Sequence, residues 1–106
     1  MVMIMNKHNQ IQTGIKSDVI NEIIKLAKKF DVHKVILFGS RARGNFQEKS
    51  DIDLAVSGGE WGMFRLAVEE ETSTLLKFDV VNLDKCASNE LLAVIEREGI
   101  VLYEKI

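Results

Sequence analysis

The sequence predicts an α/β fold, in the broad sense of a small sheet with helices packed against it. Short apolar runs rich in β-branched residues, typical of strands, recur at residues 35–38, 52–56, 78–81 and 100–103. Before and between them lie stretches in which apolar residues repeat every three or four positions, as on the buried face of a helix. The chain has 106 residues, enough for one hydrophobic core and too few for a second.

Composition narrows the class of protein. Hydrophobic residues make up 46% of the chain and charged residues 28%, as in ordinary globular proteins. The net charge is −2 and no basic run is longer than Lys28-Lys29, so we expect no stable nucleic-acid binding by this domain alone. Cys86 is the single cysteine, which excludes an internal disulfide and a multi-cysteine zinc site and agrees with a cytoplasmic location.

The N-terminal segment differs from the rest of the chain. We expect residues 1–16 to form a flexible tail and residues 17–106 to form a single domain. The apolar part of the tail spans only residues 1–5 with no basic residue before it, too short for a signal peptide or a membrane span. We therefore expect no membrane association.

A first helix is predicted from Ser17 to about Phe30. Ser17 is a suitable N-cap, and Asp18 is favourable near the positive end of the helix dipole. Apolar residues recur at helical spacing on one side of this segment, with lysines and acidic residues opposite. The apolar side belongs to the core.

The apolar run at residues 35–38 stops at Gly39-Ser40, which indicates a strand that turns into a short helix. Backbone N–H groups at such a turn have no partner, and a glycine lets a phosphate oxygen approach them. Arg41 and Arg43 follow directly. Their guanidinium groups either bind phosphate or tie the loop to nearby carboxylates, and the sequence leaves both roles open.

A second strand carries two carboxylates. Apolar and other residues alternate from Asp51 onward, which places Asp51 and Asp53 on one strand face, roughly 6 to 7 Å apart. Two such carboxylates repel each other unless a cation lies between them. Because Mg²⁺ is bound by carboxylate oxygens together with substrate phosphates, the pair is a candidate metal site.

A third carboxylate lies farther along the chain. Gly58 and Gly59 form a loop or a hinge before a helix that begins near Trp61, a residue that belongs to the core or an interface more often than it stacks on a base. In the next strand, residues 77–83, Asp79 stands among apolar residues, where a carboxylate is costly unless it is satisfied. It shares a face with the first two carboxylates if the strands are neighbours, and otherwise faces water.

The end of the chain adds a helix and a strand. Ser88 is the predicted N-cap of the helix and Gly99 its left-handed terminator. Residues 100–103 form a short strand, which we expect at an edge of the sheet.

These motifs together resemble the signature of the nucleotidyltransferase superfamily that includes DNA polymerase beta, a Gly-Ser followed after ten intervening residues by Asp-x-Asp. Gly39-Ser40 and Asp51-Ile52-Asp53 match it at every defined position. Over about residues 17–104 the chain is similar to the minimal nucleotidyltransferases that pair with HEPN-domain proteins.

The resemblance implies a mixed sheet with helices mainly on one side. It also implies an activity, in which an acceptor hydroxyl attacks the α-phosphate of a nucleoside triphosphate, ATP above all, and pyrophosphate leaves. The β- and γ-phosphates would lie at Gly39 and Ser40, and Asp79 would complete the metal site that activates the acceptor oxygen. The candidate residues are Gly39, Ser40, Arg41 and Arg43 for the nucleotide, and Asp51, Asp53 and Asp79 for two Mg²⁺ ions and catalysis.

The family also suggests a partner, a HEPN ribonuclease toxin that this chain, as its antitoxin, would AMPylate. The sequence leaves the oligomeric state open between a homo-oligomer and a hetero-oligomer. An alternative from another class is a non-catalytic antitoxin or interaction module that neutralises its partner by binding and keeps a vestigial nucleotide site. A weaker alternative is a catalytic subunit that nucleotidylates RNA or a small molecule. The three carboxylates favour an enzyme, because a binding module has no need of them.

Overall fold

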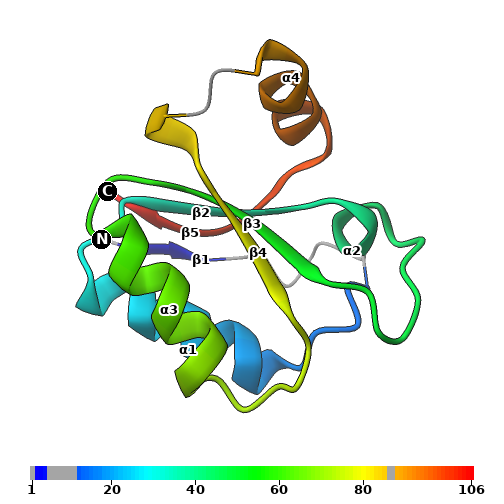
Figure 1. The fold of residues 1–106 in the computed structure, drawn as a ribbon, viewed down its shortest axis with the longest axis horizontal. Helices are drawn as coiled ribbons and strands as arrows, with labels where there is room; N and C mark the ends of the chain where they lie inside the picture. The colour runs from blue at the N-terminus through cyan, green and yellow to red at the C-terminus, as the bar shows by residue number, and fades with distance from the viewer. Residues whose placement is uncertain (1, 5–11, 86–87) are drawn as a thin grey trace.

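Five strands form one mixed sheet in the order β1-β5-β2-β3-β4 (Figure 1). The computed structural model describes residues 2–4, 12–85 and 88–106, the first of these segments by its backbone alone. Along the chain the elements are β1 (Val2–Ile4), α1 (Ser17–Lys29), β2 (Lys34–Phe38), α2 (Ser40–Arg43), β3 (Ile52–Ser57), α3 (Trp61–Glu71), β4 (Phe78–Asn82), a 3-10 turn η1 (Leu83–Lys85), α4 (Asn89–Glu98) and β5 (Ile100–Lys105). Neighbouring strands are antiparallel except β3 and β4, which are parallel, so the expected mixed sheet is confirmed.

The two longest helices, α1 and α3, cover one face of the sheet, and α4 lies against the other (Figure 1). The main core lies between α1, α3 and the sheet and buries Ile23, Leu54 and Phe64 completely. A smaller cluster of Phe38, Ala55 and Ile95 joins α4 to the opposite face. Within the described segments no helix is long and apolar enough to span a bilayer. The helices therefore lie mainly on one side, as expected.

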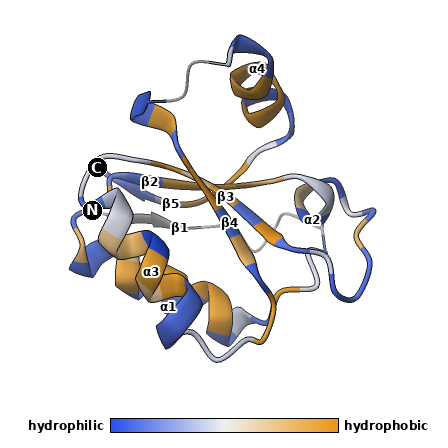
Figure 2. Ribbon diagram, viewed as in Figure 1, coloured by the Kyte–Doolittle hydropathy of each residue, from blue (hydrophilic) through white to orange (hydrophobic). Residues whose placement is uncertain are grey.

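Strand alternation decides which residues reach each face. Ile52 and Leu54 of β3 belong to the main core, whereas Ala55 belongs to the cluster under α4. Figure 2 shows hydrophobic residues concentrated along the central strands. Since side chains at i and i+2 point the same way, Asp53 lies on the α4 side of the sheet together with Ala55.

The last strand is not at an edge, contrary to expectation. β5 lies between β1 and β2, because Val2–Ile4 pairs antiparallel with its outer side. The N-terminal segment is therefore not wholly free of the fold, and Thr13 is buried as well. Residues 5–11 lie outside the described residues, and their flexibility stays a prediction.

Helix ends agree with the sequence at one place and differ at two. The Ser88 hydroxyl accepts a hydrogen bond from the backbone N–H of Leu91 at 3.1 Å and caps α4 as predicted. Ser17 begins α1 but is not its N-cap, and no side chain caps that end. Gly99 ends α4 at φ −67°, outside the left-handed region. A Cβ at Gly99 would collide with Ile95 O, so close approach explains this glycine.

The glycine pair after β3 forms a packed turn. Gly58 and Gly59 both have positive φ, 74° and 68°. The Gly58 N–H donates to Asp84 Oδ2 at 2.8 Å, and added Cβ atoms would collide with His33 and with the backbone of Asp31. The two glycines form a loop whose backbone is held in place by neighbouring residues. Of the two alternatives, a loop or a hinge, this agrees with the loop.

Candidate active site

Gly39 brings the end of β2 against β3. Its φ of 78° lies in the left-handed region, where a side chain would be strained. Phe38 pairs with Asp53 in the β2–β3 register, and a Cβ at Gly39 would collide with Asp53 Oδ2. A glycine is thus required for the turn to lie directly against a carboxylate. Ser40 begins α2 immediately after it, so the start of a helix, whose first N–H groups have no partner within the helix, lies beside that carboxylate.

The three aspartates gather where β3 and β4 begin. Asp53 and Asp79 are direct partners in the parallel β3–β4 register, on strands that lie roughly 4.8 Å apart. Phe78 and Val80 flank Asp79 and point into the main core, so Asp79 shares the α4 face with Asp53. Asp51 stands just before β3 and is exposed. The structure therefore places Asp79 on the same face as Asp53, as expected for neighbouring strands.

The electrostatics of this cluster centre on Asp53, which is half-buried. Burial, followed by the negative charges of Asp79 and Asp51, raises the pKa of Asp53 from 3.8 to about 6, and the positive charge of Arg43 opposes the rise. The pKa rises because the ionised carboxylate has lost contact with water and has like charges nearby. Near neutral pH, Asp53 therefore holds a charge that the protein alone compensates poorly.

A divalent cation would remove that imbalance. In the described part of the chain no three His, Cys, Asp or Glu side chains converge, as they stand, closely enough to enclose a metal ion. Asp53 and Asp79 nevertheless offer hard oxygen donors from adjacent strands, and Asp51 and Asp79 are exposed side chains with room to change rotamer. This donor set fits a cation shared between carboxylates once the exposed side chains turn toward Asp53.

Arg41 does not belong with the phosphate-binding candidates, and that expectation is corrected. Its side chain is buried, 1% exposed. Its guanidinium donates to the backbone carbonyls of Thr13 (2.8 Å), Ser50 (3.0 Å) and Glu48 (3.1 Å) and lies 4.8 Å from the centre of the Phe46 ring. With all three nitrogens engaged, Arg41 ties the loop before β3 to the segment before α1. It binds carbonyls, where the sequence had suggested carboxylates or phosphate.

Arg43 points elsewhere. Its side chain is 42% exposed, and its Nη1 donates to Glu98 Oε2 at 3.0 Å, which joins α2 to the end of α4. Its charge also acts on Asp53. Arg43 therefore remains a candidate for contact with an anionic substrate.

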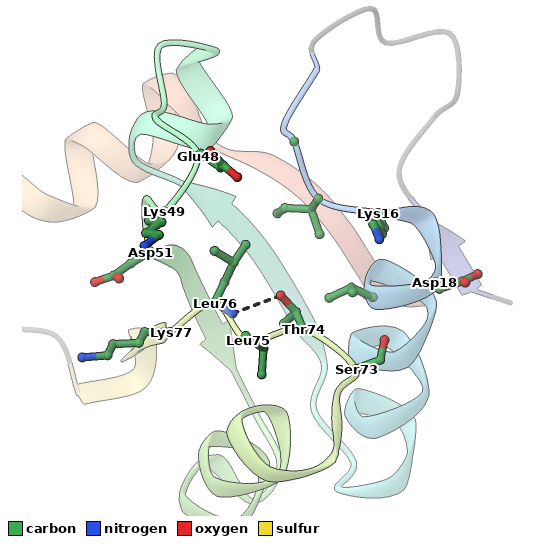
Figure 3. Close-up of a pocket in the computed structure, with 13 residues that line it drawn as sticks. Lys16, Asp18, Glu48, Lys49, Asp51, Ser73, Thr74, Leu75, Leu76 and Lys77 are labelled. Carbon is green, nitrogen blue, oxygen red and sulfur yellow. Dashed lines mark hydrogen bonds between the residues drawn. The ribbon is translucent and has the colours of Figure 1, made fainter.

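A large pocket of about 1010 Å³ opens beside Asp51 (Figure 3). Three segments line it: the start of α1, the loop before β3 and the loop before β4. Its wall is partly apolar, with Ile15, Val19, Leu75 and Leu76 among the lining residues, and lysines lie at its rim. It does not include Asp53 or Asp79, so it is a neighbour of the carboxylate cluster that shares Asp51 with it.

Two features of this region were missed by reasoning from the sequence. Glu98 lies 55 positions from Arg43, and no local pattern signals their pairing. The pocket likewise depends on segments that meet only in the fold.

Trp61, which the sequence analysis considered for stacking on a base, packs against the main core from α3, on the sheet face opposite to Asp53.

Comparison with known proteins identifies relatives of this arrangement. The family described as polymerase beta, nucleotidyltransferase, matches residues 21–106. A candidate protein adenylyltransferase of Methanocaldococcus jannaschii is 44% identical over 50 residues, which are 47% of this chain and 48% of that protein. The chain thus spans about half the length of the curated relative that it matches.

Solved structures are similar over most of the chain. A toxin-antitoxin crystallised with AMP-PNP is 27% identical, with a TM-score of 0.65 over 81% of this chain and 73% of that one. A mutant of the toxin-antitoxin MntA-HpeT with two aspartates changed to glutamate is 25% identical, with a TM-score of 0.64 and the same coverage of both chains. A tyrosine-to-alanine mutant of that complex is 26% identical, with a TM-score of 0.63 over 80% of this chain and 72% of the other.

Proposed function

Because the chain belongs to the polymerase beta nucleotidyltransferase family, we propose that it transfers AMP from ATP to a hydroxyl group of a partner protein, with release of pyrophosphate. The observation that carries the proposal is the juxtaposition of Asp53 and Asp79 on neighbouring strands, against the turn at Gly39. Carboxylates beside a glycine turn that leads into a helix N-terminus are suited to nucleotidyl transfer, because the carboxylates can hold metal ions and the turn can approach phosphate.

Each residue has a distinct proposed role. The backbone at Gly39 and Ser40 holds the β- and γ-phosphates, because a helix begins at Ser40 and the first N–H groups of a helix have no partner within it. Arg43 adds a positive charge on the same side. The acceptor oxygen attacks the α-phosphorus, the bond to the bridging oxygen of pyrophosphate breaks, and the hydroxyl proton leaves to water beside the exposed Asp79.

We assign Asp51, Asp53 and Asp79 to hold Mg²⁺, two ions by resemblance to the family. Bound there, Mg²⁺ supplies the positive charge that stabilises the attacking and leaving oxygens. The aspartates themselves fix where that charge lies relative to Gly39 and Ser40. The raised pKa of Asp53, caused first by burial and then by its acidic neighbours, supports this assignment.

A protein acceptor is favoured by the pocket beside Asp51. Gly39 lies at the end of β2, and the pocket is lined by the segments that lead into β3 and β4. The end of β2 and the starts of β3 and β4 lie at the same end of the sheet, so the pocket adjoins the carboxylate cluster, and its partly apolar wall suits an acceptor side chain such as tyrosine.

The structural relatives support a toxin as the partner, since they are toxin-antitoxin complexes. We propose a cytoplasmic HEPN ribonuclease in that role, following the family resemblance. AMP on a hydroxyl adds negative charge and bulk, which would oppose the binding of RNA phosphates by the toxin.

The test is a transfer reaction with the partner that co-purifies with this protein. With Mg²⁺ and ATP, the wild-type protein should increase the partner's mass by AMP less water per event, seen by intact-mass spectrometry. Asp51→Asn should lose more than about 100-fold of this activity, because it removes a proposed direct metal ligand. If wild-type protein neutralises the partner without changing its mass, and Asp53→Asn neutralises it equally well, the chain acts as a binding-only antitoxin.

A further inference from the structure

The end of α4 reaches the candidate site through one ion pair. Glu98, the last residue of α4, accepts a hydrogen bond from Arg43 Nη1 at 3.0 Å, and its side chain is only 19% exposed. α4 is fixed over this face of the sheet by Ile95, which packs with Phe38 and Ala55. The position of the Glu98 carboxylate therefore follows from packing of the sheet face that also carries Asp53 and Asp79.

Arg43 lies near two sources of negative charge. Its guanidinium pairs with Glu98, and Asp53 lies against Gly39, the residue that directly precedes α2. Without Glu98, this exposed guanidinium would be free to turn toward Asp53, which lies against the turn before α2. An arginine paired with Asp53 would occupy the place proposed for a cation. Glu98 draws the guanidinium away from that place and leaves it beside α2.

The contact also leaves most of the guanidinium available. Arginine has five N–H donors in a fork, and the ion pair with Glu98 uses Nη1. The side chain is 42% exposed, so a ligand has access to it. Holding a long side chain in one orientation before a ligand arrives lowers the conformational entropy that binding must remove.

We propose that Glu98 is a positioning residue, which holds the Arg43 guanidinium beside the Gly39-Ser40 turn so that it contacts the triphosphate of the nucleotide and leaves the aspartates free. This inference rests on the proposed function. It adds a residue of α4, outside the Gly-Ser and Asp-x-Asp motif, to the determinants of nucleotide affinity.

The experiment is a double-mutant cycle on the full chain, with the affinity for α,β-methylene-ATP measured calorimetrically in the presence of Mg²⁺. This analogue cannot donate AMP, so binding is measured without transfer. Glu98→Gln should weaken nucleotide binding by about 3- to 10-fold. This change in affinity corresponds to the coupling energies that double-mutant cycles find for residues in direct contact. In an Arg43→Ala background the same change should have no further effect, because Glu98 acts through Arg43. Glu98→Asp, which keeps the charge, should restore part of the affinity.

Glu96→Gln is the matched control, since Glu96 lies on the same helix and is exposed, and it should bind as the wild type does. An equal loss from Glu98→Gln in both backgrounds would show that Glu98 acts through the packing of α4 and would overturn the proposal. Unchanged or tighter binding by the single variant would overturn it too. If the wild type does not bind the analogue, the proposed function fails first, and this inference with it.

Discussion

At the scale of single residues, Arg41 and Arg43 show how a two-residue difference changes a role. Successive residues of a helix are rotated by about 100°, so positions i and i+2 point to nearly opposite sides. On α2 this rotation buries Arg41 against three backbone carbonyls and leaves Arg43 exposed beside Glu98. The first therefore holds the loop before β3 in place, and the second is available to a ligand.

Substituting each arginine by methionine should separate these roles. Arg41→Met leaves buried carbonyls without donors and should lower the free energy of unfolding by about 2–4 kcal/mol. Arg43→Met breaks an exposed ion pair and should cost less than about 1 kcal/mol, while weakening stabilisation by Mg²⁺ and nucleotide. Urea unfolding with and without Mg-ATP measures both. Equal destabilisation by the two substitutions would contradict this division.

The pKa of Asp53 sets a pH dependence of stability whose sign can be stated. Its folded pKa, about 6, is above the ordinary 3.8, so between these values the native state keeps a proton that the unfolded chain has lost. Stability of the metal-free protein should therefore fall as pH rises from about 4 to 6 and stay reduced above it. The effect is at most about 3 kcal/mol and smaller after solvent screening, since the group is only half-buried.

Asp53→Asn removes this effect and should make the metal-free protein as stable as the wild type, or more stable, at pH 7.5. The difference between the two proteins should vanish below about pH 4, where both side chains are neutral. Thermal melts across this range test the prediction. A clearly less stable Asn variant at pH 7.5 would instead mean that Asp53 has a structural role.

At the scale of elements, the edges of the sheet depend on short pairings. β4 borders the sheet on one side and β1 on the other, and β1 has only three residues. Asp79 on β4 is thus at an edge strand of the sheet, where we expect the proposed acceptor to reach the site. β1 in turn covers the outer side of β5.

Removal of β1 tests its protective role. A variant that begins at Met5 lacks Val2–Ile4 and exposes the backbone groups of β5. We expect a loss of less than about 2 kcal/mol in the free energy of unfolding, because few hydrogen bonds are involved and each has a modest net value. We also expect increased self-association through the open edge, detectable by light scattering. A variant that stays monomeric and equally stable would show that β1 contributes little.

At the scale of the whole molecule, the site consists of two adjoining regions. The carboxylate cluster lies on the α4 face of the sheet, and the pocket lies among the loops before β3, before β4 and at the start of α1. Asp51 belongs to both. If the proposed roles of the two regions are right, we expect substitutions to affect nucleotide chemistry and acceptor recognition separately.

Leu75→Asp should separate them. Leu75 lines the pocket and is fully exposed, so the change should affect stability by less than about 0.5 kcal/mol and leave nucleotide binding unchanged. Transfer to the co-purified partner should fall by about 10-fold or more if an acceptor side chain packs there. Leu66→Asp on α3, also at an exposed leucine but outside the pocket, is the matched control. Equal transfer by both variants would place the acceptor elsewhere.

The sequence by itself determined those features that depend on neighbouring residues. Alternation along residues 52–56 and 78–81 decides which side chains point into the main core. Because side chains alternate along a strand, Asp53 and Asp79 point to the opposite face of the sheet. The Gly-Ser and Asp-x-Asp spacing lies within one continuous segment, so its resemblance to a family follows from the order of residues alone. The Ser88 cap was predictable for the same reason.

Only the tertiary structure decided what depends on contacts between distant segments. The roles of Arg41 and Arg43 are set by the carbonyls and the carboxylate that the fold brings to them, and the central place of β5 by its pairing with β1. Glu98 and the pocket likewise arise where segments far apart in sequence meet. The free energy of such contacts is a property of the whole packed chain. Which segments pair with one another depends on how the other segments are packed, and no local sequence pattern encodes that.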